Sequence, residues 1–424
     1  MYGKTIDPDE EVVNQALKGH KLYRRKSKGY RGTNHISLFL RHLTAKSYLM
    51  RPVQMVDLKL QYQKIKKEID SAVLEVLESS AFINGPQVQQ FAASLAKYNS
   101  VKHVVPCANG TDALQIAMMG LGLEPGDEVI TPSFTFIATT EVVALLKLTP
   151  VFVDVDPKTF CIDPQAIRKA ITPRTKAIVP VHLYGQSANM EEIMQVAQEH
   201  NLFVIEDNAQ AIGCDYYFSD KSASKTGAIG TVSTTSFFPS KNLGGYGDGG
   251  ALMTNDDHLA NVFRKVANHG AGQRYYHDIV GCNSRLDTIQ AAVLEIKLKY
   301  LDEYINARRK AADFYDRAFD GHPKITTPFR APWCRHVFHQ YTLLVEGIDR
   351  NELHAYLAQH KLPSMIYYPV PAHRQKMFEN FNSSSANLPV TDWLTDRVIS
   401  LPMHTELDEE QLHFITSRVL EFIK

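Results

Sequence analysis

The chain has 424 residues, which is long enough to form two domains with sizeable hydrophobic cores. Its 46 lysines and arginines balance its 46 aspartates and glutamates, so its net charge of zero excludes an overall field that attracts nucleic acid. The longest apolar stretches, such as 140–155, are interrupted by charged residues, and we therefore expect no membrane-spanning segment.

The first 49 residues differ in composition from the rest of the chain. Residues 18–31 carry seven lysines and arginines in fourteen positions, without an apolar periodicity long enough to pack. A secretory signal would need an apolar core, and Asp7, Asp9 and Glu10 argue against a transit peptide. We predict a basic, disordered extension over 1–49, with RNA binding as a less favoured alternative.

Short β-branched runs alternate with helical patterns from residue 104 to residue 254, which is typical of an α/β domain. A helix is expected to begin near Gly110. Because ligands gather at the carboxyl ends of the strands in such sheets, we expect the functional residues there. The predicted strands are 104–105, 128–131, 151–155, 177–181, 202–207, 231–238 and 251–253.

The apolar spacing from Ala292 to Phe319 predicts one long helix that bridges into a smaller C-terminal domain. In that domain we predict strands at 341–345 and 364–368, and helices at 352–359 and 409–423. The sequence therefore predicts a large α/β domain over 50–292, and a bridging helix with a small α+β domain over 293–424.

Lys241 lies in a polar, glycine-rich loop, thirty-four residues after the predicted strand that ends at Asp207. A lysine amine with a lowered pKa can form a Schiff base with an aldehyde. An acid at the end of an apolar strand can pair with the pyridinium nitrogen of pyridoxal phosphate, which keeps the ring able to accept electrons. Each residue taken alone is compatible with an ordinary surface position, so the prediction depends on the residues that accompany them.

A phosphate site is predicted where the helix at Gly110 begins. Backbone N–H groups of Gly110 and Thr111 would point at the phosphate with the helix dipole behind them, and Ser236 supplies a hydroxyl. Gln210 can hydrogen-bond the phenolic oxygen of the cofactor, and Phe134 can stack on its ring. Together with Lys241 and Asp207, these residues indicate a pyridoxal phosphate enzyme.

The glycines after Lys241 also match the dinucleotide-binding pattern G-x-G-x-x-G, from Gly245 to Gly250. That fingerprint must follow a strand and open a helix, whereas here a loop precedes it and a strand-like run follows. We therefore expect these glycines to let the chain bend sharply, and we do not predict a dinucleotide site.

The motifs, in this order and spacing, resemble those of the DegT/DnrJ/EryC1 nucleotide-sugar aminotransferases, over roughly residues 50 to 424. This resemblance implies fold type I of the pyridoxal phosphate enzymes, with a mixed central sheet flanked by helices. It implies Lys241 as the attachment point of pyridoxal phosphate and Asp207 as the pyridinium partner. The reaction it implies is amino transfer from L-glutamate to a keto sugar on a nucleotide.

Residues 281–292 resemble the family segment that enters the active site of the neighbouring subunit. By that resemblance, Asn283 binds the phosphate in the partner's site and Arg285 lies near the substrate. A homodimer with shared active sites follows from this expectation.

The keto sugar is predicted from weaker similarities. The segments 109–117, 172–185 and 281–292 are most similar to aminotransferases that make 3-amino sugars, including those acting on UDP-2-acetamido-2-deoxy-3-oxo-glucuronate. Arg285 can pair with a hexuronate carboxylate, but it can equally hold a diphosphate. Tyr367 stands where these relatives usually carry histidine, so a dTDP-3-oxo-6-deoxyhexose remains an alternative substrate.

Tyr367, Tyr368 and His182 are the other predicted substrate-binding residues. His182 follows a predicted strand and fits a structural histidine at least as well.

Two other functional classes share this fold with the aminotransferases. A pyridoxamine-dependent sugar dehydratase of this fold would carry histidine in place of Lys241. A non-catalytic regulatory protein would have little need for the complete set of cofactor residues. The five cysteines are odd in number and lack C-x-x-C spacing, which favours reduced thiols in the cytoplasm over disulfides or a metal site.

Overall fold

A computed structural model describes residues 50–381 and 386–424. Its contacts divide the chain into two units, Met1–Pro52 and Val53–Lys424, and every element below belongs to the second unit. The extension predicted over 1–49 lies outside the described residues.

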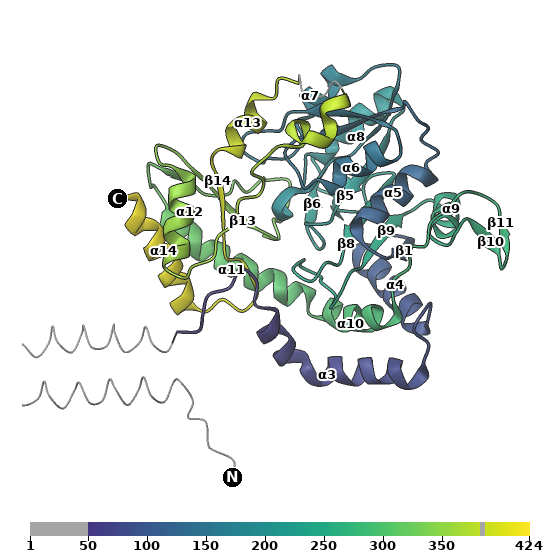
Figure 1. The fold of residues 1–424 in the computed structure, drawn as a ribbon, viewed down its shortest axis with the longest axis horizontal. Coiled ribbons are helices and arrows are strands. Elements are labelled where there is room, and N and C mark those ends of the chain that lie inside the picture. The colour runs from purple at the N-terminus through teal and green to yellow at the C-terminus, as the bar shows by residue number, and fades with distance from the viewer. Residues whose placement is uncertain (1–49, 382–385) are drawn as a thin grey trace, which may run out of the picture. The chain divides into compact units, whose positions relative to one another are not determined.

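A seven-stranded sheet forms the centre of the second unit (Figure 1), with the strand order β1-β9-β8-β5-β4-β2-β3. Strands β8, β5, β4, β2 and β3 are parallel, whereas β9 is antiparallel to both of its neighbours, β1 and β8. The mixed sheet predicted from the sequence is confirmed. The strands are β1 (His103–Cys107), β2 (Glu128–Pro132), β3 (Thr149–Val153), β4 (Thr175–Ile178), β5 (Phe203–Asp207), β8 (Val232–Ser236) and β9 (Gly250–Thr254).

Helices cover both faces of this sheet. They are α4 (Pro86–Asn99), α5 (Gly110–Gly120), α6 (Ala138–Leu145), α7 (Pro164–Ala170), α8 (Met190–His200), α9 (Asp257–Ala267) and α10 (Thr288–Lys299). Because successive strand residues point to opposite faces, Val204 packs in the core with α7 and α8. Its neighbour Ile205 packs in the core with α5, α6 and α9. Burial on both faces explains why these strands are continuous apolar runs.

Two short hairpins and a long helix lie outside the sheet. They are β6 (Asp215–Tyr217) with β7 (Ala223–Lys225), β10 (Ala271–Gln273) with β11 (Tyr276–His277), and α3 (Leu58–Ser79). The β10–β11 hairpin projects beyond α9 (Figure 1) and exposes 78% of Tyr275. Val280, just after it, is 83% exposed. Exposed apolar side chains in a cluster are typical of a surface that binds another protein.

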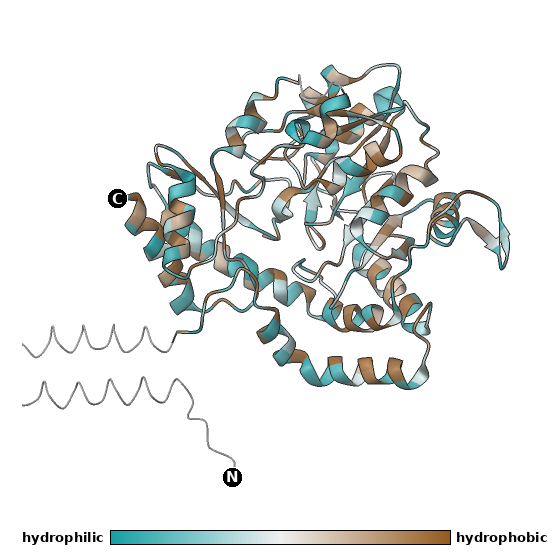
Figure 2. Cartoon of the chain, viewed as in Figure 1, coloured by the Kyte–Doolittle hydropathy of each residue, from teal (hydrophilic) through white to brown (hydrophobic). Residues whose placement is uncertain are grey.

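The chain after α10 forms a smaller three-stranded antiparallel sheet with helices beside it. Helices such as α11 and α14 carry both hydrophilic and hydrophobic residues along their length (Figure 2), as expected of helices that bury one face. The division at residue 292 remains a prediction. The elements are α11 (Leu301–Phe319), β12 (Ile325–Thr326), β13 (Tyr341–Val345), α12 (Arg350–Gln359), α13 (Pro389–Thr395), β14 (Val398–Leu401) and α14 (Glu409–Ile423).

Two predicted elements differ from the structure. The single helix expected from Ala292 to Phe319 is two helices, because Tyr300 between α10 and α11 has φ −99° and ψ 0°. The strand expected over 364–368 is a single bridge between Met365 and Ser400. The chain leaves the edge of β14 after that bridge, and Tyr367 and Tyr368 reach a cavity instead. Within 50–381 and 386–424, no helix combines the length and apolarity needed to cross a bilayer.

Candidate active site

A cavity of about 630 Å³ opens at the carboxyl ends of β5 and β8. This volume lies in the range of sites that hold small molecules and cofactors. Eight residues predicted from the sequence line it, together with side chains that the sequence did not single out. The eight are Gly110, Thr111, Asp207, Gln210, Ser236, Lys241, Tyr367 and Tyr368.

Lys241 is held in the loop between β8 and β9, where its backbone N–H donates to the carbonyl of Phe238 at 2.8 Å. Burial lowers the pKa of the Lys241 amine to about 8, and the nearby Asp207 carboxylate opposes this effect. At pH 7 about one amine in ten is then neutral, whereas an ordinary lysine is almost entirely protonated. A neutral amine can attack an aldehyde and can accept a proton.

Asp207 is the last residue of β5, and hydrogen bonds orient both of its carboxylate oxygens. Oδ2 accepts from the Thr139 hydroxyl at 2.8 Å, and Oδ1 accepts from the Ala209 backbone N–H at 3.1 Å. Only 5% of Asp207 is exposed, so the carboxylate is a buried acceptor beside Lys241. Such a group suits a positively charged ring nitrogen.

Another part of the cavity wall is formed by the N-terminus of α5 and the end of β8. Asn109 caps the helix by accepting from the Asp112 N–H at 2.8 Å, while the N–H groups of Gly110 and Thr111 have no acceptor within the helix. A Cβ at Gly110 would lie 2.7 Å from the Cβ of Ser236, so glycine is required for this close approach. The arrangement suits an anion.

Gln210 connects the sheet to the tyrosines from the C-terminal part of the chain. Its Oε1 accepts from the Tyr184 backbone N–H at 2.7 Å, and its Nε2 donates to the Tyr368 hydroxyl oxygen at 3.1 Å. The Tyr184 hydroxyl in turn donates to the carbonyl oxygen of Tyr367. The three aromatic residues and Gln210 therefore support one another at one wall of the cavity.

The structure corrects the choice of stacking aromatic. Phe134 is only 1% exposed and packs edge to face against Phe160 and Tyr368, with ring centroids 6.2 Å away in both pairs. Phe136 lines the cavity and is 53% exposed. Both phenylalanines follow β2, and the sequence does not reveal which of them the turn directs inward.

His182 does not line the cavity. It is fully buried, its Nε2 lies 2.9 Å from Glu206 Oε2, and its Nδ1 accepts from the Ala188 N–H at 3.2 Å. Burial opposes ionisation of Glu206, but hydrogen bonds from His182, Gly230 and Gly227 hold the pKa of this carboxyl below its usual value. Because side chains alternate along β5, Glu206 and Asp207 face opposite ways, and His182 has a structural role.

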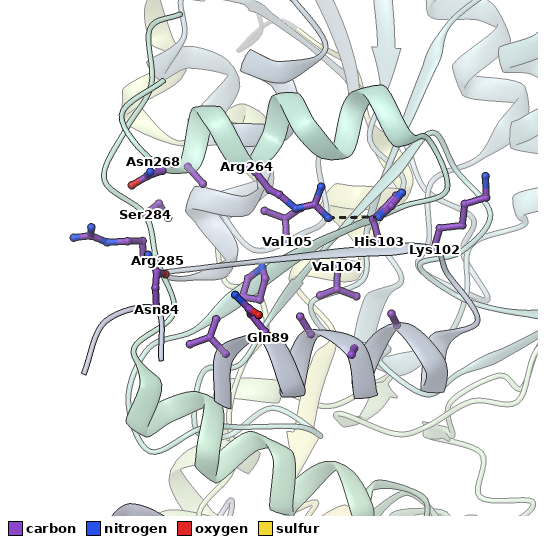
Figure 3. Close-up of a pocket in the computed structure, with 16 residues that line it drawn as sticks. Asn84, Gln89, Lys102, His103, Val104, Val105, Arg264, Asn268, Ser284 and Arg285 are labelled. Atoms are coloured by element: carbon purple, nitrogen blue, oxygen red, sulfur yellow. Dashed lines mark hydrogen bonds between the residues drawn. The ribbon is translucent and has the colours of Figure 1, made fainter. Parts of the chain in front are cut away.

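Asn283 and Arg285 also lie outside the Lys241 cavity of their own chain. Ser284, between them, turns inward and donates to Asp112 Oδ2 at 2.6 Å, while Asn283 is exposed. Arg285 lines a separate pocket of about 510 Å³ between α4, β1 and α9. Figure 3 shows Arg285 at one end of that pocket and Lys102 at the other. Within the described residues, Arg285 forms no ion pair.

Sequence reasoning missed two groups of residues that line this cavity. His339 and Gln340 line it from the segment before β13, and Phe238 and Asp248 line it from the Lys241 loop. Burial, with help from the charges of Lys241 and Arg308, lowers the pKa of His339 well below its usual value, so its ring is neutral. The only sequence signal for this position was a polar pair directly before a predicted strand.

Comparison with known protein families identifies the family of the chain. The model of the DegT/DnrJ/EryC1/StrS aminotransferase family matches residues 63–420. The chain belongs to this family. The predicted family and fold class are thereby confirmed.

Relatives in this family cover nearly the whole chain. A "Pleiotropic regulatory protein" of Geobacillus stearothermophilus is 45% identical, over 88% of this chain and 99% of the relative. A UDP-2-acetamido-2-deoxy-3-oxo-D-glucuronate aminotransferase of Pseudomonas aeruginosa is also 45% identical, over 86% and 98%. A UDP-N-acetyl-3-dehydro-alpha-D-glucosamine 3-aminotransferase of Acidithiobacillus ferrooxidans is 44% identical, over 85% and 95%. A dTDP-3-amino-3,4,6-trideoxy-alpha-D-glucose transaminase of Streptomyces venezuelae is 39% identical, over 87% and 96%.

Solved structures of aminotransferases share the fold. The DesV protein of S. venezuelae, solved with a ketimine intermediate, has a TM-score of 0.83 and 38% identity, over 88% of this chain and 99% of its own. A Bacillus subtilis NtdA structure with the bound cofactor PMP has a TM-score of 0.80 and 32% identity, over 87% and 83%. The predicted enzyme class and vitamin B6 cofactor agree with these family members.

The residues in the cavity also fit pyridoxal phosphate on their own evidence. The amine of Lys241 has a lowered pKa, the buried Asp207 carboxylate lies near it, and Gly110 leaves an anion-binding helix terminus against Ser236. An aldehyde, a ring nitrogen and a phosphate are the three groups that this set of residues suits.

Proposed function

We propose that the chain is a pyridoxal phosphate-dependent aminotransferase that moves an amino group from L-glutamate to C3 of a UDP-linked 2-acetamido-2-deoxy-3-oxo sugar. The observation that carries the proposal is the lowered pKa of the Lys241 amine beside the oriented Asp207 carboxylate, in one cavity. A surface lysine would have no reason to lose its charge near neutral pH.

The protein's own groups have distinct roles in this reaction. Pyridoxal phosphate supplies an aldehyde that carries the amino group and a ring that accepts an electron pair. Lys241 Nζ accepts and releases the proton that must move during amino transfer, because its pKa of about 8 lets the amine do both near neutral pH. Asp207 keeps a negative charge against the ring nitrogen, and Gly110, Thr111 and Ser236 hold the phosphate. Gln210 orients the phenolic oxygen.

The substrate proposal rests on the relatives and on the cavity wall. Two relatives at 45% and 44% identity act on UDP-linked sugars with a 3-oxo group, one with and one without a uronate. The dTDP-sugar relative is 39% identical, so a dTDP-3-oxo-6-deoxyhexose is the second choice. Tyr367 lines the cavity, and burial raises the pKa of its hydroxyl, so the group is neutral and carries no charge to pair with a carboxylate.

The test is product mass spectrometry after incubation with glutamate and a panel of keto sugars. The panel contains UDP-2-acetamido-2-deoxy-3-oxo-glucose, its glucuronate counterpart and a dTDP-3-oxo-6-deoxyhexose. We expect a 3-amino product from at least one UDP sugar at a higher kcat/KM than from the dTDP sugar. Preference for the dTDP sugar would reverse the order of the two substrate proposals.

A non-catalytic regulatory role is the alternative from another class, and the name of one relative at 45% identity favours it. A regulator that retains the fold would bind pyridoxal phosphate without transferring amino groups. Conversion of the bound cofactor to its amino form by glutamate, followed by absorbance, separates the two proposals. A spectrum that no amino acid changes would favour the regulator.

We also infer that the active unit is a cytoplasmic homodimer with two shared sites. The exposed Asn283, the unpaired Arg285 and the exposed tip near Tyr275 support a second copy that completes the site. No arginine from the same chain lines the Lys241 cavity within the described residues, although both proposed substrates are anionic. Cys107, Cys161, Cys214, Cys282 and Cys334 are all free thiols, which supports a reducing compartment.

Mixing two inactive variants tests the shared sites. One variant is Lys241→Ala, and the other combines Asn283→Asp with Arg285→Ala. In a mixed dimer, one site carries both defects and the other carries none. With random exchange of subunits, about a quarter of the wild-type activity should return. Background activity despite heterodimer formation, or full activity of a monomer at high dilution, contradicts sharing.

A further inference from the structure

A threonine outside the cavity wall contacts the acid that faces the ring nitrogen. Thr139 lies in the first turn of α6 and is 1% exposed. Its hydroxyl donates to Asp207 Oδ2 at 2.8 Å, although 68 residues separate the two in sequence. Thr139 is absent from the residues that line the cavity, so any effect it has on a ligand passes through the two cavity-lining side chains that it contacts, Asp207 and Thr135.

The direction of this hydrogen bond follows from the chemistry of its partners. An ionised carboxylate has no proton to give, so the single hydroxyl proton of Thr139 points at Asp207. The Thr139 oxygen also lies 3.3 Å from the hydroxyl oxygen of Thr135. Because the Thr139 proton is already committed, Thr135 is the donor in that contact. The three side chains form a chain of donors that ends on the carboxylate.

The other oxygen of Asp207 is held as well, by the Ala209 backbone N–H at 3.1 Å. Rotation of the carboxylate about its Cβ–Cγ bond would break both hydrogen bonds in a buried environment, where unpaired polar groups are costly. The Thr139 hydroxyl therefore fixes the plane in which Asp207 presents its charge to the cavity.

We propose that Thr139 is a positioning residue, which, together with Thr135 of the cavity wall, fixes the Asp207 carboxylate for the ring nitrogen of bound pyridoxal phosphate. This inference rests on the proposed function, because it takes pyridoxal phosphate as the ligand of the cavity. If Thr139 were purely structural, its replacement would change the stability of the protein but not the pH at which the ring nitrogen loses its proton.

Thr139→Val tests the inference, because valine keeps the shape and removes the donor. Thr140→Val is the matched control: Thr140 is the next residue of α6, is fully buried, and donates instead to the Ile137 carbonyl at 3.0 Å. We expect Thr139→Val to weaken pyridoxal phosphate binding by up to about tenfold, because the hydrogen bond also exists without the ligand and only part of its contribution affects binding. Thr139→Ser should restore most of the affinity, and Thr140→Val should bind normally.

A second measurement separates positioning from stability. The absorbance of the bound cofactor, titrated with pH, reports the protonation of its ring system. In Thr139→Val the pH at which the ring loses its proton should differ from that of the wild type, because Asp207 loses both a hydrogen bond and its fixed orientation. In an Asp207→Asn background, Thr139→Val should add almost nothing to either measurement.

The outcomes distinguish a failure of the proposed function from a failure of the positioning role of Thr139. A wild-type protein that does not bind pyridoxal phosphate would contradict the proposed function itself. If the wild type binds it and Asp207→Asn changes the titration, but Thr139→Val behaves like Thr140→Val, the positioning role is wrong. If Thr139→Val does not fold, Thr139→Ala gives the same comparison against Thr140→Ala.

Discussion

Lys241→Ala is expected to abolish the visible absorbance of the purified protein and to reduce amino transfer at least about 10²–10⁴-fold, the usual contribution of a general acid–base group. Without the amine, no covalent link to the cofactor aldehyde forms. Thr111, Ser236 and Asp207 remain in the cavity, so weak binding of pyridoxal phosphate should persist. Absorbance, equilibrium dialysis and turnover measure the three effects.

A buried lysine outside the cavity makes this test sharper. Lys297 is 1% exposed, its Nζ lies 5.2 Å from the centre of the Tyr246 ring, and it does not line the cavity. Burial lowers the pKa of Lys297 to about 7, with a further contribution from Arg308. A lowered pKa alone therefore does not identify the reactive lysine. Lys297→Met should keep the visible band, and borohydride reduction with peptide mapping should label Lys241. A label on Lys297 would overturn the assignment.

The pH dependence of cofactor attachment follows from the pKa of Lys241. Its folded-state pKa of about 8 lies below its ordinary value, so the reactive neutral amine is gained as pH rises toward 8. The rate at which the apoprotein attaches pyridoxal phosphate should rise about tenfold from pH 6 to pH 7 and level off above pH 8. A rate that still rises steeply to pH 10 would indicate an unperturbed lysine.

Asp207→Asn should leave the fold intact and slow amino transfer by roughly 2–5 kcal/mol in the barrier. The amide matches the carboxylate in shape, but it cannot hold the proton on the ring nitrogen, so the ring accepts electrons poorly. Single-turnover kinetics with glutamate measure the step directly.

Asp248→Asn is the control for loss of charge in the same cavity. Asp248 lines the cavity but is exposed to solvent, so its charge is screened and its replacement should have a much smaller effect. Near-normal turnover of Asp207→Asn with full cofactor occupancy would show that another group serves the ring nitrogen.

The cofactor end of the cavity was predictable because it is built from the ends of strands. Asp207 ends β5, Ser236 ends β8, and Gly110 opens α5 shortly after β1. Hydrophobic runs locate such strands, and parallel packing brings their ends together. Lys241 lies in a loop whose composition is distinctive in its own right.

The other contacts of the cavity could not be predicted, because a sequence does not show which way each side chain points. Phe134 and Phe136 follow the same strand, and only the local turn decides that Phe136 lines the cavity. His339 precedes β13 without any motif, and Thr139 appears as an ordinary helix residue until the fold brings it to Asp207. The break at Tyr300 was hidden because the apolar spacing continues on both sides of it.

The cavity described above draws its walls from two distant stretches of chain. Residues from Asn109 to Asp248 surround the proposed chemistry, whereas His339, Gln340, Tyr367 and Tyr368 close the cavity from the C-terminal part of the sequence. Substitutions in the second stretch can therefore change the cavity wall and leave Lys241 and Asp207 untouched. Chimeras that exchange residues beyond 330 between family members would keep Lys241 and Asp207 of one parent, and their substrate preference would measure how much of the sugar choice the second stretch carries.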